Sequence, residues 1–175
     1  MPARVFDNLF PAVLLIFLTV CPAALADEST VAAGTIELHK CTDAKLEVEL
    51  LCHPDWELQT EEDMVLMIVS QKPLVTVTIA KSQGKGISLR RLTPGVLQEM
   101  GQYAEGFETH NVLIDGQRAI EVKGHSLAHP TARFLDYYIV RRGQLYSVLF
   151  SVDPQERWPD YEPLLLEIKG SVHFL

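Results

Sequence analysis

Residues 132–175 constrain the fold of this chain more than any other stretch. Two segments, 134–141 and 144–152, have the length and composition of β-strands and flank the turn Arg142-Gly143. The second segment carries apolar side chains on both faces: Tyr146, Val148, Phe150 and Val152 on one, Leu145 and Leu149 on the other. Strands that are apolar on both faces are covered on both sides, so this hairpin is predicted to lie at the centre of a sheet.

A helix is predicted to follow the hairpin and to fold back over it. Asp153-Pro154 is typical of a helix start. Apolar residues then recur at three- and four-residue spacing, which indicates one buried helical stripe. The stripe consists of Trp158, Tyr161, Leu165, Ile168 and Val172. Pro159 and Pro163 are expected to separate the first turns from the remainder, because proline lacks the amide hydrogen that a helix interior needs.

Upstream patterns add hairpins and one more helix. Residues 46–50 alternate as a half-buried strand does. Two hairpins are predicted around Lys72-Pro73 and Asp115-Gly116, the second being a strong turn signal. Their strands are 64–71 with 74–81, and 112–114 with 118–124. A helix is expected over 93–104, ended by Gly106. Antiparallel hairpins interrupted by two helices indicate the α+β class.

The first 26 residues have the pattern of a secretory signal. One arginine precedes an apolar run, and the segment ends in Ala24-Leu25-Ala26, so cleavage is predicted after Ala26. A retained anchor is the alternative, but Pro11 and Pro22 interrupt the apolar run well short of the ~20 residues that a spanning helix needs. Lipidation at Cys21 is a further alternative, since Leu18 stands three residues before it. The expected location is periplasmic or secreted, with no membrane span after cleavage.

The mature chain then divides into a flexible leader, 27–40, and one domain, 41–175. It keeps two cysteines, and an even pair in an oxidising compartment predicts the disulfide Cys41–Cys52. Two free buried thiols are the alternative. No zinc site is expected, because neither cysteine belongs to a C-x-x-C pair with a second pair of ligands.

Charge and motifs exclude several classes of function. The formal charge is −8 without a basic stripe, which argues against nucleic acid as a partner. No G-x-S-x-G motif occurs, and Gly84-Lys85-Gly86 lacks the spacing of a phosphate loop. The chain is therefore predicted not to be an enzyme and to carry no cofactor.

The remaining polar clusters are interpreted as surface. His125 and His129 have H-x-x-x-H spacing but run into Pro130, so exposed loop histidines are favoured over a metal site that would include His39 and His53. Glu61-Glu62-Asp63 is expected to be a solvated turn. Arg90-Arg91 and Arg141-Arg142 are expected to protect strand ends, with an anion or partner patch as the alternative.

A family resemblance rests on residues spread along 41–175. Pro54-Asp55-Trp56 is followed by the strand Gly-Gln-Leu-Tyr-Ser-Val-Leu-Phe-Ser at 143–151. A helix then bears Trp158, Tyr161, Ile168, Ser171 and Phe174. This order resembles the PsbP-like proteins, including small exported bacterial proteins of the DcrB type. The Cys41/Cys52 pair is not part of the pattern.

The resemblance implies an antiparallel sheet of about six strands sandwiched between helices, an α/β/α sandwich. It implies accessory or binding proteins, among them lumenal photosystem II subunits, periplasmic proteins tied to phage uptake and a Ran-binding import factor. The expected function is that of an exported, non-catalytic accessory protein of the periplasm that contacts an unidentified periplasmic or membrane protein. The alternative is a small-ligand or metal carrier with a cavity beneath the last helix, around Trp158 and Tyr161.

Overall fold

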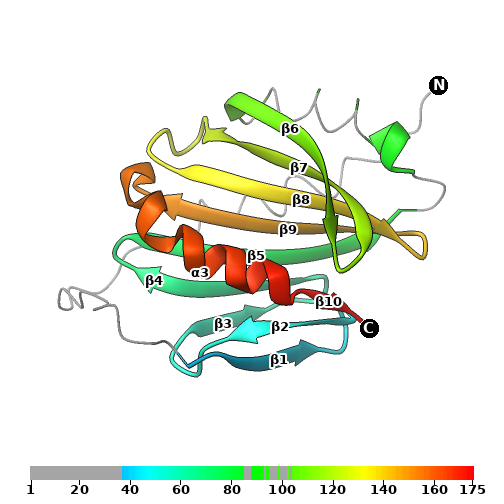
Figure 1. Cartoon of the computed structure of the whole chain (residues 1–175), viewed down its shortest axis with the longest axis horizontal. Helices are drawn as coiled ribbons and strands as arrows, with labels where there is room; N and C mark the ends of the chain where they lie inside the picture. The colour runs from blue at the N-terminus through cyan, green and yellow to red at the C-terminus, as the bar shows by residue number, and fades with distance from the viewer. Residues whose placement is uncertain (1–36, 85–87, 93, 95–97, 99–101, 103) are drawn as a thin grey trace. The chain divides into compact units, whose positions relative to one another are not determined.

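The computed structural model describes residues 37–84, 88–92, 94, 98, 102 and 104–175. Within them, strands form two antiparallel sheets (Figure 1). The larger has the order β3-β4-β5-β9-β8-β7-β6, and the smaller has the order β1-β2-β10. The strands of the larger sheet are β3 (Glu57–Thr60), β4 (Met64–Gln71), β5 (Leu74–Gln83), β6 (Ala104–Ile114), β7 (Gln117–Ser126), β8 (Arg133–Arg141) and β9 (Gln144–Asp153).

The hairpin β8–β9 lies at the centre, as predicted. Strand β9 is the fourth of seven and pairs with β5 on one side and with β8 on the other. Its turn places Arg142 at φ 49° and Gly143 at φ 76°, which is the left-handed geometry of a two-residue hairpin turn. Tyr146, Val148 and Phe150 are each 1% exposed, so the face that they share belongs to the core.

Helix α3 (Trp158–Ser171) covers this face and contacts both β9 and β2. A short 3₁₀ turn, η1 (Gln155–Arg157), leads into it. The expected break at Pro163 was wrong, because α3 continues through it. Pro163 stands in the second turn, where its missing amide costs one hydrogen bond, and burial of the apolar stripe offsets that loss. All members of the stripe are buried: Trp158, Tyr161, Leu165 and Ile168 within α3, and Val172 directly after it.

Strand β6 corrects the prediction for its region. It begins at Ala104, where a helix end was expected, and Gly106 lies inside it at a bulge with φ 57°. The stretch is polar, and most of its side chains are half-buried or exposed, as suits the last strand of a sheet. Its sequence therefore gave no apolar alternation by which to recognise a strand. Most of the predicted helix 93–104 lies outside the described residues.

The smaller sheet was not predicted as a separate unit. It contains β1 (His39–Asp43), β2 (Val48–Cys52) and β10 (His173–Phe174). The expected single sheet of about six strands was wrong: the described part of the chain forms one sheet of seven strands and one of three. Strand β1 includes two residues assigned to the leader, His39 and Lys40, while residues 27–36 of the leader and the signal segment lie outside the described residues. The α+β class holds, and a second helical layer stays a prediction.

Gly124 in β7 offers a test of packing between β7 and the bulge of β6. A Cβ at Gly124 would lie 2.9 Å from the Cβ of Phe107 and 3.1 Å from its Cα. We expect Gly124→Ala to lower the free energy of unfolding by about 1–2 kcal/mol, because main chain must shift to admit the methyl group. Urea unfolding of the purified domain measures the change.

The matched control is Gly170→Ala, since apart from its chain neighbours and the backbone of α3 itself no atom lies within 4 Å of a Cβ at that position. Alanine is the better helix former, so this variant should be neutral or slightly more stable. Equal loss of stability in both variants would contradict the packing argument.

Candidate functional site

Cys41 and Cys52 are joined by a disulfide between β1 and β2, with a Cα–Cα distance of 6.0 Å. The register pairs Cys41 with Leu50 and Cys52 with His39, so the bond runs diagonally across the hairpin. Cys52 is 1% exposed, whereas Cys41 is half-buried. One sulfur therefore belongs to the core and the other lies at its border.

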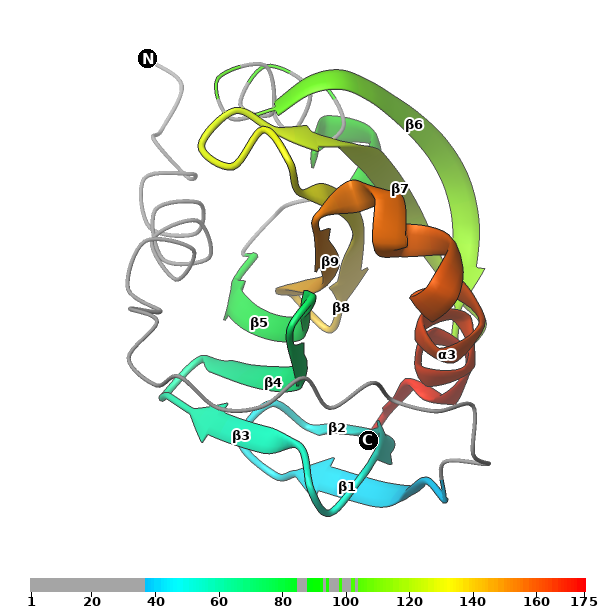
Figure 2. The same ribbon diagram turned by 90° about the vertical axis from the view of Figure 1, so that its left-hand side faces the viewer.

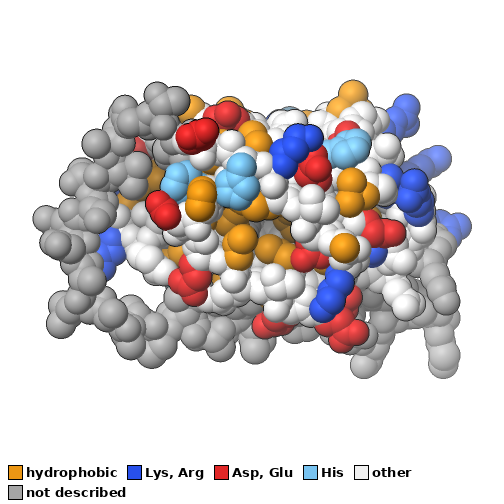
Figure 3. Space-filling view, turned by 90° about the horizontal axis from the view of Figure 1, so that it is seen from below, with side chains coloured by type: hydrophobic (Ala, Val, Ile, Leu, Met, Phe, Trp, Pro, Cys, Tyr) orange, Lys and Arg blue, Asp and Glu red, His pale blue; other side chains and the backbone are white. Residues whose placement is uncertain are grey.

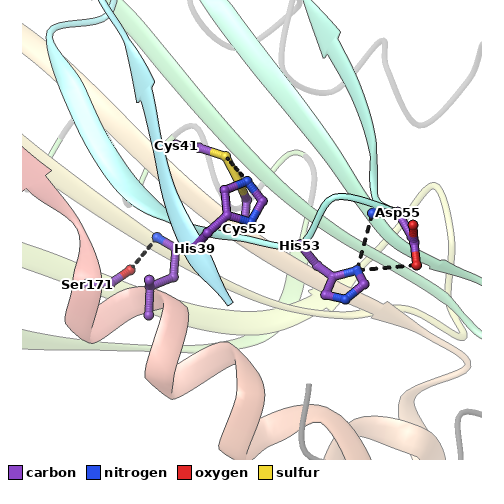
Figure 4. Close-up of a disulfide and its surroundings, with 7 residues drawn as sticks. His39, Cys41, Cys52, His53, Asp55 and Ser171 are labelled. Atoms are coloured by element: carbon purple, nitrogen blue, oxygen red, sulfur yellow. Dashed lines mark hydrogen bonds and ion pairs between the residues drawn. A yellow bond between two sulfur atoms is a disulfide. The ribbon is translucent and has the colours of Figure 1, made fainter. Parts of the chain in front are cut away.

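His39 stands beside both sulfur atoms (Figure 4). Its Nε2 lies 3.5 Å from Cys41 Sγ and 3.3 Å from Cys52 Sγ. His53, the next residue after Cys52, turns away instead: its Nδ1 is 3.2 Å from the backbone nitrogen of Asp55 and 3.7 Å from Oδ2. The structure thus brings one of the two predicted neighbouring histidines to the cysteines. His39 is on a strand and not in a loop.

A cavity of about 110 Å³ opens next to the disulfide. It lies where the smaller sheet comes alongside β3 and β4 (Figure 2). Its lining is mainly apolar and includes both cysteines, Leu50, Leu58, Met67 and Ile79. The face seen from below carries hydrophobic side chains near its middle, with histidines and acidic residues around them (Figure 3). The combination of an apolar hollow and a polar rim is typical of a contact surface.

The end of the chain holds the smaller sheet against the larger one. The Leu51 amide donates to Ser171 Oγ at 2.8 Å, and the Leu175 amide donates to Glu47 O at 2.9 Å. Arg141 and Arg142 donate to the main-chain oxygen of Leu175 at 2.6 and 3.2 Å. This arginine pair therefore binds the main chain at Leu175, a role that the sequence did not indicate.

An ion pair lies nearby. Lys81 Nζ donates to Glu47 Oε2 at 2.8 Å. That hydrogen bond, aided by the lysine charge, holds the pKa of Glu47 below its usual value. The same bond raises the pKa of Lys81. Both groups stay charged near neutral pH, so they fix the turn before β2 without offering acid–base chemistry.

Other predicted clusters remain apart from this site. His125 lies in β7 and His129 in the following turn, so they lack helical spacing, as expected. The interpretation as exposed loop histidines was wrong, because His125 is on a strand and both side chains are half-buried. Among the described residues, three side chains lie close enough together to hold a metal ion: His39, Cys41 and Cys52. Residues 61–63 are exposed between β3 and β4, in agreement with a solvated turn. Arg90-Arg91 are exposed as well, but they lie in the helical segment 89–92 and not at a strand end, so that expectation was wrong.

The cavity expected beneath the last helix was wrong in its place and size. The space beside Trp158 measures about 10 Å³, room for one water molecule. Trp158 is 2% exposed, its Nε1 donates to Glu162 at 3.1 Å, and the guanidinium of Arg133 lies 4.7 Å from its ring centroid. The aromatic residues of α3 are thus packing residues.

Sequence reasoning missed Asp136, a carboxylate buried in β8 on the face opposite α3. Burial raises its pKa to about 6, although hydrogen bonds, among them one from Ser147 Oγ at 2.8 Å, act in the other direction. One signal was present: Asp136 is a charged residue between Leu135 and Tyr137 in a strand predicted to be covered on both sides.

No helix among the described residues has both the length and the apolar character needed to cross a membrane. No family model matches the sequence. No curated protein matches it either.

Solved structures do match. Cyanobacterial PsbP (CyanoP) from Synechocystis sp. PCC 6803 aligns with a TM-score of 0.60 at 17% identity, over 86% of this chain and 99% of that one. The Saccharomyces cerevisiae Ran-binding protein Mog1p aligns with a TM-score of 0.54 at 8% identity, over 80% of this chain and 96% of that one. Protein PA94 from Pseudomonas aeruginosa aligns with a TM-score of 0.50 at 15% identity, over 76% of this chain and 94% of that one.

Proposed function

We propose that this chain, which has the PsbP-like fold, is an exported, non-catalytic accessory protein that binds another protein of the periplasm or membrane. The observation that carries the proposal is the open apolar cavity between the two sheets, next to the disulfide. Export is supported by the signal pattern of residues 1–26. The absence of a catalytic motif in the sequence supports a binding role.

The strands on either side of the cavity are suited to a protein partner. Strand β1 is an edge strand of the smaller sheet, and β3 is an edge strand of the larger one. A terminal strand has one edge on which a partner strand can add by backbone hydrogen bonds. Leu58 of β3 is 49% exposed and also lines the cavity, so an apolar contact is available at the same place.

The size of the cavity favours a side chain over a small ligand. Pockets for drug-sized ligands measure roughly 300–1,000 Å³, and a dry cavity of about 150 Å³ admits benzene. A volume of about 110 Å³ therefore suits one aliphatic or small aromatic side chain. Interfaces are commonly anchored by such a residue in a pocket. This argument places protein binding ahead of carriage of a free small molecule.

A variant of Leu58 tests the proposal. The mature chain, fitted with a short cross-linker, would be incubated with periplasmic and membrane extracts of the source cells. We expect one protein to be captured, and Leu58→Asp to reduce its capture by at least 10-fold, because the charge cannot be buried in the contact. Quantitative mass spectrometry of the cross-linked product measures this.

Leu113→Asp is the control, since Leu113 is 65% exposed on β6, at the opposite edge of the same sheet. It should capture as much partner as the unmodified chain. Equal capture by the Leu58 variant, or no specific product in either extract, would refute the proposed binding role.

A further inference from the structure

We infer that the reduced chain binds one Cu(I) ion through His39 Nε2, Cys41 Sγ and Cys52 Sγ. The proposal goes beyond the proposed protein-binding role and does not depend on it. It starts from a geometric fact: the three donor atoms lie within 4.8 Å of one another. His39 of β1 faces Cys52 of β2 and Cys41 lies diagonally across from Cys52, so the hairpin backbone holds the three side chains together.

The disulfide and the ion exclude each other. The bonded sulfurs have no thiolate charge to give, so the oxidised hairpin is the form without a site. Reduction adds two electrons and two protons to the Cys41–Cys52 bond, supplied by a dithiol that leaves as its own disulfide. Cu(I) then displaces the two thiol protons as it binds. The site is therefore opened by reduction and closed by oxidation.

The donor set selects the class of ion. Thiolate ligands favour soft ions such as Cu(I) and zinc, whereas carboxylates favour hard ones. A structural zinc site takes four protein ligands, but the cluster among the described residues has three. Cu(I) forms stable complexes with as few as two or three soft ligands, so three donors suffice for it. Asp43 stands on the same face, yet its Oδ1 accepts the amides of Lys45 and Leu46 at 2.9 and 2.8 Å. It is already engaged in the turn.

The site is accessible from solvent on one side. His39 is exposed and Cys41 is half-buried, so an ion or a reducing dithiol can approach from the outer edge of β1. Cys52 closes the inner side, where it is 1% exposed. An apolar inner wall and a polar outer wall would restrict the water around the bound ion.

The test is a titration of the reduced, oxygen-free mature chain with Cu(I) against a chromophoric Cu(I) chelator. A phosphine reduces the cysteines and is removed before the titration, because phosphines are themselves ligands for Cu(I). We expect one equivalent to bind, His39→Ala to weaken binding by at least 10-fold, and Cys41→Ser or Cys52→Ser by at least 100-fold. The oxidised chain should take no Cu(I) from the chelator.

His53→Ala is the matched control, because His53 adjoins Cys52 in sequence but faces Asp55 (Figure 4). It should bind Cu(I) as the unmodified chain does. His39→Ala retains both cysteines, so formation of its disulfide and an unchanged circular dichroism spectrum verify that it folds. Unaltered affinity in His39→Ala, equal binding by the oxidised chain, or preference for Zn²⁺ over Cu(I) in a direct competition would each overturn the assignment.

Discussion

Asp136→Asn should make the protein more stable at pH 8 by about 2 kcal/mol, with little change at pH 4. Asp136 is 4% exposed within β8 and accepts a hydrogen bond from Ser147 Oγ. An ionised carboxylate in that position has lost most of its hydration, which is costly even when it is hydrogen-bonded. Asparagine keeps an oxygen of the same shape for Ser147 and carries no charge to desolvate.

The sign follows from the pKa of Asp136 in each state. Burial raises the pKa to about 6 in the folded chain, against a usual value of 3.8. Between these values the folded state holds a proton that the unfolded state has released, so the free energy of unfolding falls as pH rises from about 4 to about 6. A difference of about two units corresponds to roughly 3 kcal/mol in total. Well above pH 6 the full free-energy cost of burying the ionised Asp136 carboxylate is present, and below pH 4 this cost disappears.

Chemical denaturation at a series of pH values from 4 to 8 measures this difference. The unmodified chain should lose stability across the window, and Asp136→Asn should lose less. Asp55→Asn serves as the control, since that carboxylate is 89% exposed and should show no comparable change. If the free energy of unfolding of Asp136→Asn changed with pH as that of the unmodified chain does, the Asp136 carboxylate would not be the cause of the pH dependence.

The centre of the fold was predictable because its residues carry a redundant signal. In β9 both faces are apolar and the turn Arg142-Gly143 fixes the register, so pattern and turn chemistry agree. Helix α3 was recognisable from a stripe whose members are buried. Strand β3 is exposed throughout, and β10 has two residues, so neither presents the alternation by which strands are recognised.

The site was only partly predictable, because it depends on which strands become neighbours. The pairing of Cys41 with Cys52 follows from residues close in sequence. The contribution of His39 depends on the register of β1 against β2, and the cavity depends on the approach of two sheets. Asp43 ends β1 and the turn to β2 follows it, so the position of this turn decides which side chains of the two strands face one another.

Cys41→Ser should lower the free energy of unfolding by about 2.5–3 kcal/mol under oxidising conditions, the chain-entropy value for a loop of this length. The bond matters most for β1, whose residues are exposed or half-buried and therefore gain little from burial. Without the bond, β1 depends on its pairing with β2 and on the Lys40–Glu49 ion pair at 2.6 Å. A surface pair of this kind contributes at most about 1 kcal/mol.

Melting experiments with and without a reductant distinguish the effect of losing the disulfide from the effect of replacing the cysteine side chain. With a phosphine present, the unmodified chain and Cys41→Ser should melt together, because neither has the cross-link and serine differs little from a half-exposed thiol. Without it, the unmodified chain alone should melt higher. Equal melting in both conditions would show that the disulfide adds nothing to stability. Hydrogen exchange gives a second readout: amides of β1 should lose protection on reduction, while those of the central strand β9 keep theirs, because β9 is held by β5 and β8 independently of the bond.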